Sequence, residues 1–273
     1  MQFQGKKVLI TGGSRGIGKA IAIRLAAEGA DVAIVGKTAE PHPKLEGTIH
    51  TAAAEISKAG SGKVLPIQGD IRFEESIEQI VKTTMEGLGG IDILINNASA
   101  ISLTPTEQTE PKRWDLMHDI NVRGTFFMSK ACLPHLKKAA NPHILTLSPP
   151  LTLNPEWFGR FLAYTISKFG MSMIVLGLAE EMRTHRIGVN ALWPKTTIAT
   201  AAVKNVIGGD ALMQRSRKPE IVADAAFYIL QRSSTECTGN FFIDEDILQQ
   251  QGITDFGHYA VNPSQKLMPD LFL

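Results

Sequence analysis

Short apolar runs alternate with longer amphipathic stretches along the whole chain, and this alternation constrains the fold more than any other feature. Runs such as VLIT (8–11) and DILI (92–95) are almost continuously apolar, which is typical of strands buried on both faces. Strands that alternate with helices build βαβ units and a parallel sheet. The pattern predicts strands at 7–11, 31–36, 63–68, 91–95, 143–147, 187–192 and 240–243, and helices near 17–28, 47–59, 74–88, 112–138, 164–184 and 219–231.

The length of 273 residues suits one α/β domain with a sizeable core. No linker or repeat interrupts the alternation, so we predict a single doubly wound domain over 1–273. Its tail, about 249–273, has no periodic pattern, and we expect it to drape over the domain, where it could shape a pocket or an oligomer contact.

Composition excludes several classes of function. The formal net charge is +1 with no basic block, which gives nucleic-acid binding no electrostatic support. Cys132 and Cys237 lie in no ligand or disulfide pattern, and the histidines are scattered, so we predict no metal site and a reducing compartment. Without a signal peptide or an apolar run of eighteen residues, the chain is predicted to be cytoplasmic with no membrane span.

A glycine-rich turn joins the first strand to the first helix. Glycines allow a tight turn and close backbone approach, and the free N–H groups at a helix start favour a pyrophosphate. The motif follows a strand and opens a helix, as this mechanism requires, and therefore predicts a Rossmann-type dinucleotide site. The candidate residues are Gly12, Gly13, Ser14, Arg15, Gly16, Ile17 and Gly18.

The second strand is followed by Lys37, at the place where an NAD site usually carries an acidic residue for the ribose 2′-hydroxyl. Arg15 in the glycine turn is a second cation within reach. Both could bind a 2′-phosphate by charge-assisted hydrogen bonds, although both could instead be solvated surface charges. The pair favours NADP(H).

Tyr164 and Lys168 are four residues apart on a predicted helix, so one ligand can meet both side chains. An ordinary tyrosine pKa of about 10 is too high for ready proton exchange near neutrality. We expect the lysine, together with the positive nicotinamide of the oxidised cofactor, to lower that pKa, so that Tyr164 can donate a proton to a carbonyl oxygen or remove it in reverse. On its own, the pair could also be an ordinary feature of a helix.

Four motifs in order make the chain similar to the short-chain dehydrogenase/reductase family. They are Thr11-Gly12-x-x-x-Gly16-x-Gly18, Asn96-Asn97-Ala98, Asn121 and Tyr164-x-x-x-Lys168. The resemblance covers almost the whole chain, and segments such as NNASAISLTPT and NALWPKT resemble one branch of this family.

The resemblance implies further roles. Asp70 would contact adenine, while Asn97, Ala98 and Lys168 would lie at the nicotinamide ribose. Asn121 would support a proton-relay water. Pro194 and Thr196 would lie at the cofactor after the sixth strand, where Thr196 or Thr197 could contact the carboxamide. The family's long helices build the interfaces of dimers and tetramers. We therefore expect the stretches 112–138 and 164–184 to form the interface of a homodimer or homotetramer, although they could also simply cover the sheet.

Two positions depart from the family pattern. A Ser-Ser pair commonly ends the strand before the tyrosine, but here Ser148 is followed by Pro149, which has no donor. Ser148 could take over the polarising role, Thr152 or Asn154 could replace it, or the site could lack that donor. After the sixth strand the family's Pro-Gly is Pro194-Lys195, where Lys195 could meet an anionic substrate group or be a surface charge.

These features predict an NADP(H)-dependent oxidoreductase that interconverts an alcohol and a ketone. The resemblance implies a hydrophobic substrate, such as a fatty acyl or sterol-like lipid, and the link 149–162 carries apolar residues, Leu151, Leu153, Trp157 and Phe158. The alternative is a catalytically weak cofactor-binding sensor or assembly protein, for which Pro149 is the best argument.

Overall fold

The computed structural model describes residues 1–41 and 47–273. Its centre is a seven-stranded parallel sheet in the order β3-β2-β1-β4-β5-β6-β7. The strands are β1 Lys7–Thr11, β2 Asp31–Gly36, β3 Val64–Gln68, β4 Ile93–Asn96, β5 His143–Thr146, β6 Gly188–Trp193 and β7 Phe241–Ile243. The predicted doubly wound Rossmann-type fold is therefore confirmed, and each predicted strand is present to within two residues.

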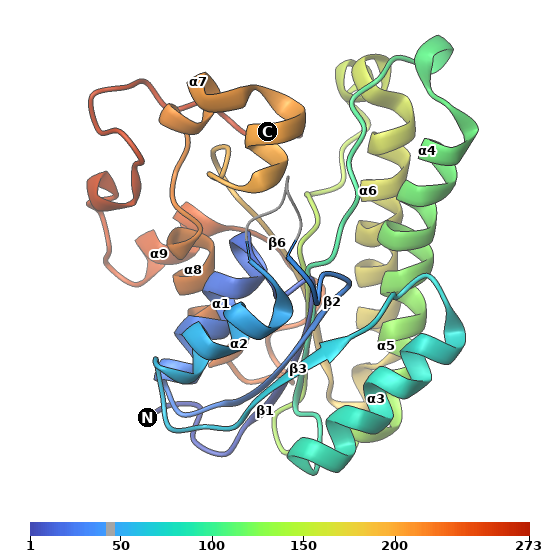
Figure 1. The fold of residues 1–273 in the computed structure, drawn as a ribbon, viewed down its shortest axis with the longest axis vertical. Coiled ribbons are helices and arrows are strands. Elements are labelled where there is room, and N and C mark those ends of the chain that lie inside the picture. The colour runs from blue at the N-terminus through green and yellow to red at the C-terminus, as the bar shows by residue number, and fades with distance from the viewer. Residues whose placement is uncertain (42–46) are drawn as a thin grey trace.

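Helices cover both faces of this sheet, as Figure 1 shows. They are α1 Gly16–Ala27, α2 Ile49–Ser57, α3 Glu74–Leu88, α4 Pro111–Met117, α5 Thr125–Leu136, α6 Pro155–Glu181, α7 Gly209–Gln214, α8 Glu220–Leu230 and α9 Asp244–Gln250. In β1, Val8 and Ile10 pack in the core under α1, α2, α8 and α9, whereas Leu9 packs in the core under α3, α5 and α6. Successive side chains of a strand point to opposite faces, which explains why the strands are apolar throughout.

The strand order reverses at β1, which pairs with β2 on one side and β4 on the other. In doubly wound sheets a ligand crevice opens at this point, beyond the carboxyl ends of the strands. Thr11 ends β1 beside Val35 of β2 and Asn96 of β4. The glycine turn and the Asn96-Asn97 turn therefore meet at the reversal.

Two helix predictions need correction. The stretch 112–138 is α4, a π-helical segment at His118–Gly124, and α5, because the wider π turn interrupts the α-helical hydrogen bonds. The link 149–162 is helical from Pro155, so α6 starts nine residues before Tyr164. Asn154 caps this start by accepting from the Glu156 amide at 3.1 Å, and Phe161 (φ −146°, ψ 56°) bends the helix just before the tyrosine.

The helix α9 was not predicted, and only its last two residues, Gln249 and Gln250, reach into the region expected to be a tail. After Gln250 the chain contains one short 3-10 turn, Gly257–Tyr259, and isolated bridges, including one between Pro269 and Thr196. Its last residues lie against the end of β6 and the middle of α6, where Tyr164 is buried. The tail thus covers the domain as expected, and it covers the candidate site.

Candidate active site

The glycine turn has the backbone shape that a phosphate cradle needs. Gly12 has φ +68° and Gly16 has φ +54°, a region that residues with a side chain rarely adopt. A Cβ on Gly18 would lie 2.4 Å from Asn97 Nδ2 and 2.5 Å from Gly12 O, and one on Gly13 would lie 2.7 Å from Ile34 Cβ. Only glycine fits these positions. The first N–H groups of a helix have no partner within the helix, so the start of α1 beside this turn suits a dinucleotide pyrophosphate.

Thr11 and Asn97 hold this turn against the next strand. The Thr11 hydroxyl accepts hydrogen bonds from the amides of Asn97 and Ala98, both at 3.1 Å. The Asn97 side chain in turn donates to Thr11 O at 3.0 Å and Gly12 O at 2.9 Å. Asn97 and Ala98, predicted to line the cofactor, therefore border the cradle at the strand-order reversal, and Asn97 also orders it.

The predicted adenine end gathers around Asp70, just beyond β3. Asp70 accepts three hydrogen bonds from Arg72 at 2.6–3.0 Å, and Lys37 Nζ lies 3.1 Å from its Oδ2. Burial raises the pKa of Asp70, but the bonds from Arg72 and Lys37 outweigh it and lower that pKa to about 2. Asp70 is thus a firmly charged anchor, and Arg72 is a partner that the sequence reasoning missed.

Lys37 and Arg15 both lie at the mouth of the cradle. Lys37 has a side chain that is 56% exposed, and it directly follows β2, which ends at Gly36. Arg15 precedes α1 and donates to Gly47 O at 3.1 Å; burial lowers its pKa, and its Nε is buried without a partner among the described residues. An unsatisfied buried donor of this kind suits an anion.

Asn121 lies in the π-helical segment, fully buried. Its Oδ1 accepts from the Ala100 amide at 2.8 Å, and its Nδ2 donates to Ala100 O at 2.9 Å and Ser167 Oγ at 3.0 Å. Asn121 therefore fastens the loop after β4 to α6 on the helical turn that bears Tyr164 and Lys168. Single π turns inside helices are frequent at functional sites.

Tyr164 and Lys168 lie on the inner face of α6, and both are nearly inaccessible, at 5% and 2% exposure. Lys168 Nζ donates to Leu147 O at 2.6 Å and to Met171 Sδ at 3.3 Å. It also lies 5.0 Å from the centre of the Trp193 ring. The structure brings together the pair proposed from sequence, but it buries both groups.

Burial changes the expected electrostatics of this pair. It lowers the pKa of Lys168 to about 7, against the opposing charge of Asp270. Burial, with the nearby Asp270 carboxylate, raises the pKa of Tyr164 above its ordinary value. The protein alone therefore does not lower the tyrosine pKa, because desolvation exceeds the influence of a lysine that is itself desolvated, and the expected lowering stays a prediction for the site with its cofactor bound.

Ser148 and its possible substitutes lie apart from one another. Ser148 is fully buried at the end of β5, and its Oγ has no hydrogen-bond partner among residues 1–41 and 47–273. Thr152 Oγ1 accepts from the Asn154 amide at 3.2 Å, and Asn154 caps α6. Thr152 and Asn154 thus both have local structural roles. Of the three candidate side chains, only that of Ser148 makes no hydrogen bond to the described residues.

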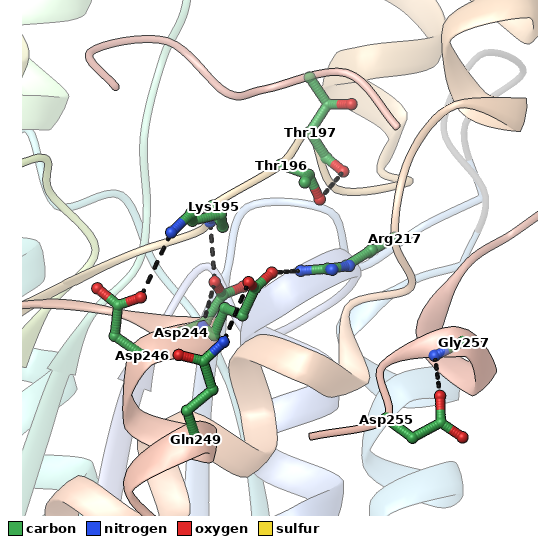
Figure 2. Close-up of polar contacts among 10 residues, drawn as sticks. Lys195, Thr196, Thr197, Arg217, Asp244, Asp246, Gln249, Asp255 and Gly257 are labelled. Atoms are coloured by element: carbon green, nitrogen blue, oxygen red, sulfur yellow. Dashed lines mark hydrogen bonds and ion pairs between the residues drawn. The ribbon is translucent and has the colours of Figure 1, made fainter. Parts of the chain in front are cut away.

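The segment after β6 is held by two carboxylates of α9, the buried Asp244 and the half-exposed Asp246. The Lys195 amide donates to Asp244 Oδ1 at 2.8 Å, and the exposed Lys195 Nζ lies 3.4 Å from Asp246, as Figure 2 shows. Burial raises the pKa of Asp244 to about 6. Lys195 thus pairs with an acid on α9, in keeping with a surface charge, while Pro194 and Thr196 are buried where the tail crosses this segment.

The tail contributes two side chains that the sequence reasoning did not single out, Asp270 and Phe272. Phe272 stacks on Tyr164, with ring centres 6.1 Å apart, and also contacts Trp157, Phe169 and Trp193. Trp157 and Phe158, expected to support a hydrophobic substrate, border this cluster, whereas Leu151 and Leu153 are exposed. The only signal in the sequence was a run of apolar residues, LMPDLFL, after an irregular stretch.

Among the described residues, α6 is the one helix long and apolar enough to cross a membrane. However, 56% of its most apolar window is buried inside the fold, and its inner face carries Tyr164 and Lys168. These properties are those of the core helix of a folded domain.

Comparison with known proteins agrees with this architecture. A family profile described as short chain dehydrogenase matches residues 6–208. Hydroxysteroid dehydrogenase-like protein 2 of Danio rerio is 59% identical over 272 residues, and the Homo sapiens protein of the same name is 55% identical. Each match covers 100% of this chain but only 65% and 64% of the relative, so the chain spans a little under two thirds of their length.

Solved structures give the same result. A dehydrogenase from Xanthomonas campestris superposes with a TM-score of 0.96 at 51% identity, covering 100% of this chain and 99% of the other. A short chain dehydrogenase from Burkholderia cenocepacia, crystallised in complex with NADP, superposes with a TM-score of 0.76 at 28% identity, covering 89% and 97%.

Proposed function

This chain belongs to the short-chain dehydrogenase/reductase family, and from that membership we propose that it is an NADP(H)-dependent enzyme interconverting an alcohol and a ketone on a hydrophobic molecule. The observation that carries the proposal is the placement of Tyr164 and Lys168 on the inner face of α6. This helix packs on a sheet that carries the glycine turn at the point where the strand order reverses. The cradle would hold the pyrophosphate, and the bound cofactor supplies hydride to the carbonyl carbon.

The residues of this chain would handle the proton. In reduction, the Tyr164 hydroxyl donates its proton to the carbonyl oxygen, and the phenolate that remains is stabilised by the Lys168 ammonium one helical turn away. In oxidation the same hydroxyl position receives the proton. Asn121 ties the Ala100 loop to α6 and so holds the helical turn of Tyr164 in place.

The preference for NADP(H) rests on charge at the adenosine end. Lys37 and Arg15 are the cations at the mouth of the cradle, and Lys37 directly follows β2, where an NAD site usually has an acid. The NADP complex of the Burkholderia cenocepacia relative is in keeping with this choice.

The proposal of a hydrophobic substrate rests on the side chains around Tyr164. Trp157, Phe169 and Trp193 form an aromatic wall there. Such a wall favours an apolar molecule, because a polar one would lose hydrogen bonds to water without replacing them. The relatives' name, hydroxysteroid dehydrogenase-like protein 2, agrees with an alcohol or ketone on an apolar skeleton.

Replacement of Tyr164 by phenylalanine tests this function. Tyr164→Phe keeps the ring that stacks on Phe272 and removes the proton donor, so turnover should fall about 10²–10⁴-fold while NADPH affinity and thermal stability stay near wild type. Lys168→Met should reduce both turnover and NADPH affinity. Tyr228→Phe, on α8 at the opposite face of the sheet, is the matched control and should behave like wild type.

The assay is NADPH oxidation with a panel of apolar ketones, combined with calorimetry of cofactor binding. Equal turnover by Tyr164→Phe and wild type on a good substrate would refute the assigned role. The second candidate, a cofactor-binding sensor, is favoured by Pro149 and by the covered Tyr164. It predicts NADPH binding without reduction of any ketone in the panel.

A further inference from the structure

The residues Met268–Phe272, here called the strap, pair with the segment that follows β6. The Thr197 amide donates to Met268 O at 2.9 Å, and the Asp270 amide donates to Lys195 O at 3.2 Å. Pro269 and Thr196 form an antiparallel bridge between these bonds, and Trp193 Nε1 donates to Leu271 O at 2.8 Å. The strap is therefore seated on the segment that contains Pro194 and Thr196, the candidate nicotinamide residues.

Phe272 extends from the strap onto the candidate catalytic tyrosine. Its ring is 4% exposed, and its centre lies 6.1 Å from the Tyr164 ring at an interplanar angle of 29°. Phe169 and Trp193 surround it, with ring centres at 5.3 and 5.9 Å. A reacting carbonyl must come within about 2.6–3.2 Å of the Tyr164 hydroxyl, and Tyr164 as a whole is only 5% exposed. The Phe272 ring therefore occupies space against the Tyr164 ring into which a bulky substrate would have to fit.

The strap carries two features that weaken its closed position. Phe272 has φ +72°, a conformation that costs free energy for a residue with a side chain. Asp270 is an acid near Lys168, Tyr164 and Asp244; burial raises the pKa of Asp270 to about 7, and the attraction of the Lys168 ammonium offsets this only in part. The outer face of the strap is open, since Met268 is 37% exposed. Its closed position therefore rests mainly on a few backbone bonds and on the burial of Phe272.

We propose that the strap is a displaceable cover on the substrate side of Tyr164, and that Phe272 is its plug and a specificity-determining residue. A substrate is admitted when its apolar part can take the place of the Phe272 ring against Phe169 and Trp193. Small polar ketones bury too little surface to displace the ring, so the closed strap discriminates against them. This inference rests on the proposed reductase function and adds the means by which the site selects hydrophobic substrates.

The first test compares 2-decanone with 2-butanone as substrates for the NADPH-loaded full chain. Phe272→Ala removes the plug, so kcat/KM for 2-butanone should rise on the order of tenfold while that for 2-decanone changes much less. Leu273→Ala, which alters the exposed neighbour, is the matched control and should leave the ratio of the two constants unchanged. An equal loss for both ketones in Phe272→Ala would mean that Phe272 is a fixed wall, and would overturn the proposal.

The second test needs no turnover. Amide hydrogen exchange at Thr197 and Asp270 reports two of the hydrogen bonds that seat the strap, those between it and the segment after β6. We expect saturating 2-decanone to speed exchange at both amides in wild type, and Phe272→Ala to show fast exchange without ligand. If Phe272→Ala is poorly folded by circular dichroism, Phe272→Leu serves instead, with a smaller increase in the same direction.

The two tests separate the failure of the strap from the failure of the reductase. Faster exchange with 2-decanone but no reduction of any ketone would support the cover and refute the proposed enzyme. Reduction of 2-decanone with unchanged exchange at Thr197 and Asp270 would support the enzyme and refute the cover.

Discussion

Lys37 offers the sharpest test of cofactor choice. Lys37 Nζ lies 3.1 Å from Asp70 Oδ2, but the lysine side chain is 56% exposed. Ion pairs this exposed contribute about 0–1 kcal/mol, so Lys37 can leave Asp70 for a 2′-phosphate at little cost. Asp70 would remain held by three hydrogen bonds from Arg72.

The size of the effect follows from the kind of contact. A hydrogen bond between charged groups contributes about 1.5–3 kcal/mol, which corresponds to roughly 10–150-fold in affinity. Lys37→Ala should therefore weaken NADPH binding by that factor and leave NADH binding nearly unchanged. Lys37→Asp should go further, because a carboxylate repels the 2′-phosphate and can accept from the 2′-hydroxyl of NADH.

Isothermal titration calorimetry of NADPH and NADH with each variant measures these constants. Lys82→Asp is the matched control, since Lys82 is also an exposed lysine, 67% exposed and 4.0 Å from Glu86 on α3. Its affinities should equal those of wild type. If wild type binds NADH as tightly as NADPH, or if Lys37→Asp keeps its NADPH affinity within a factor of about two, the assignment of Lys37 is wrong.

Two further substitutions test the missing serine and the oligomer. Ser148→Ala removes a fully buried hydroxyl beside Pro149, so we expect turnover of the best ketone to stay within about fivefold of wild type. A loss near 10²-fold, as for removal of an oxyanion donor, would show that Ser148 polarises the carbonyl. Met173, Ile166 and Leu176 form an exposed apolar stripe on α6, at 62%, 38% and 52% exposure, which we interpret as the interface of a homodimer or homotetramer. Met173→Glu should convert that oligomer to monomers by light scattering, and a wild type that is already monomeric at micromolar concentration would contradict the interpretation.

The sequence by itself determined the sheet, because the signals for it are local. Each buried strand is a short apolar run that lies between two helices in the sequence. A parallel sheet covered by helices on both faces is the arrangement that buries such runs. The cradle was equally readable, since Gly12 and Gly18 act through the conformation and close contacts of their own backbone. For the same reason Lys37 could be placed at the end of β2 from its position in the chain.

The state of Tyr164 depended on the tertiary structure. From sequence we expected a tyrosine with a lowered pKa and had no signal for its burial, but the fold buries it beneath Phe272, 108 residues further along the chain. The bend of α6 at Phe161 and the π turn at Asn121 are set by packing between elements, which no local pattern encodes. The early start of α6, in contrast, had a local signal in the Asn154 cap followed by Pro155, which our prediction overlooked. Motifs determine which groups are present, whereas a pKa and the access to a hydroxyl depend on the surrounding desolvation, and only the folded chain supplies that.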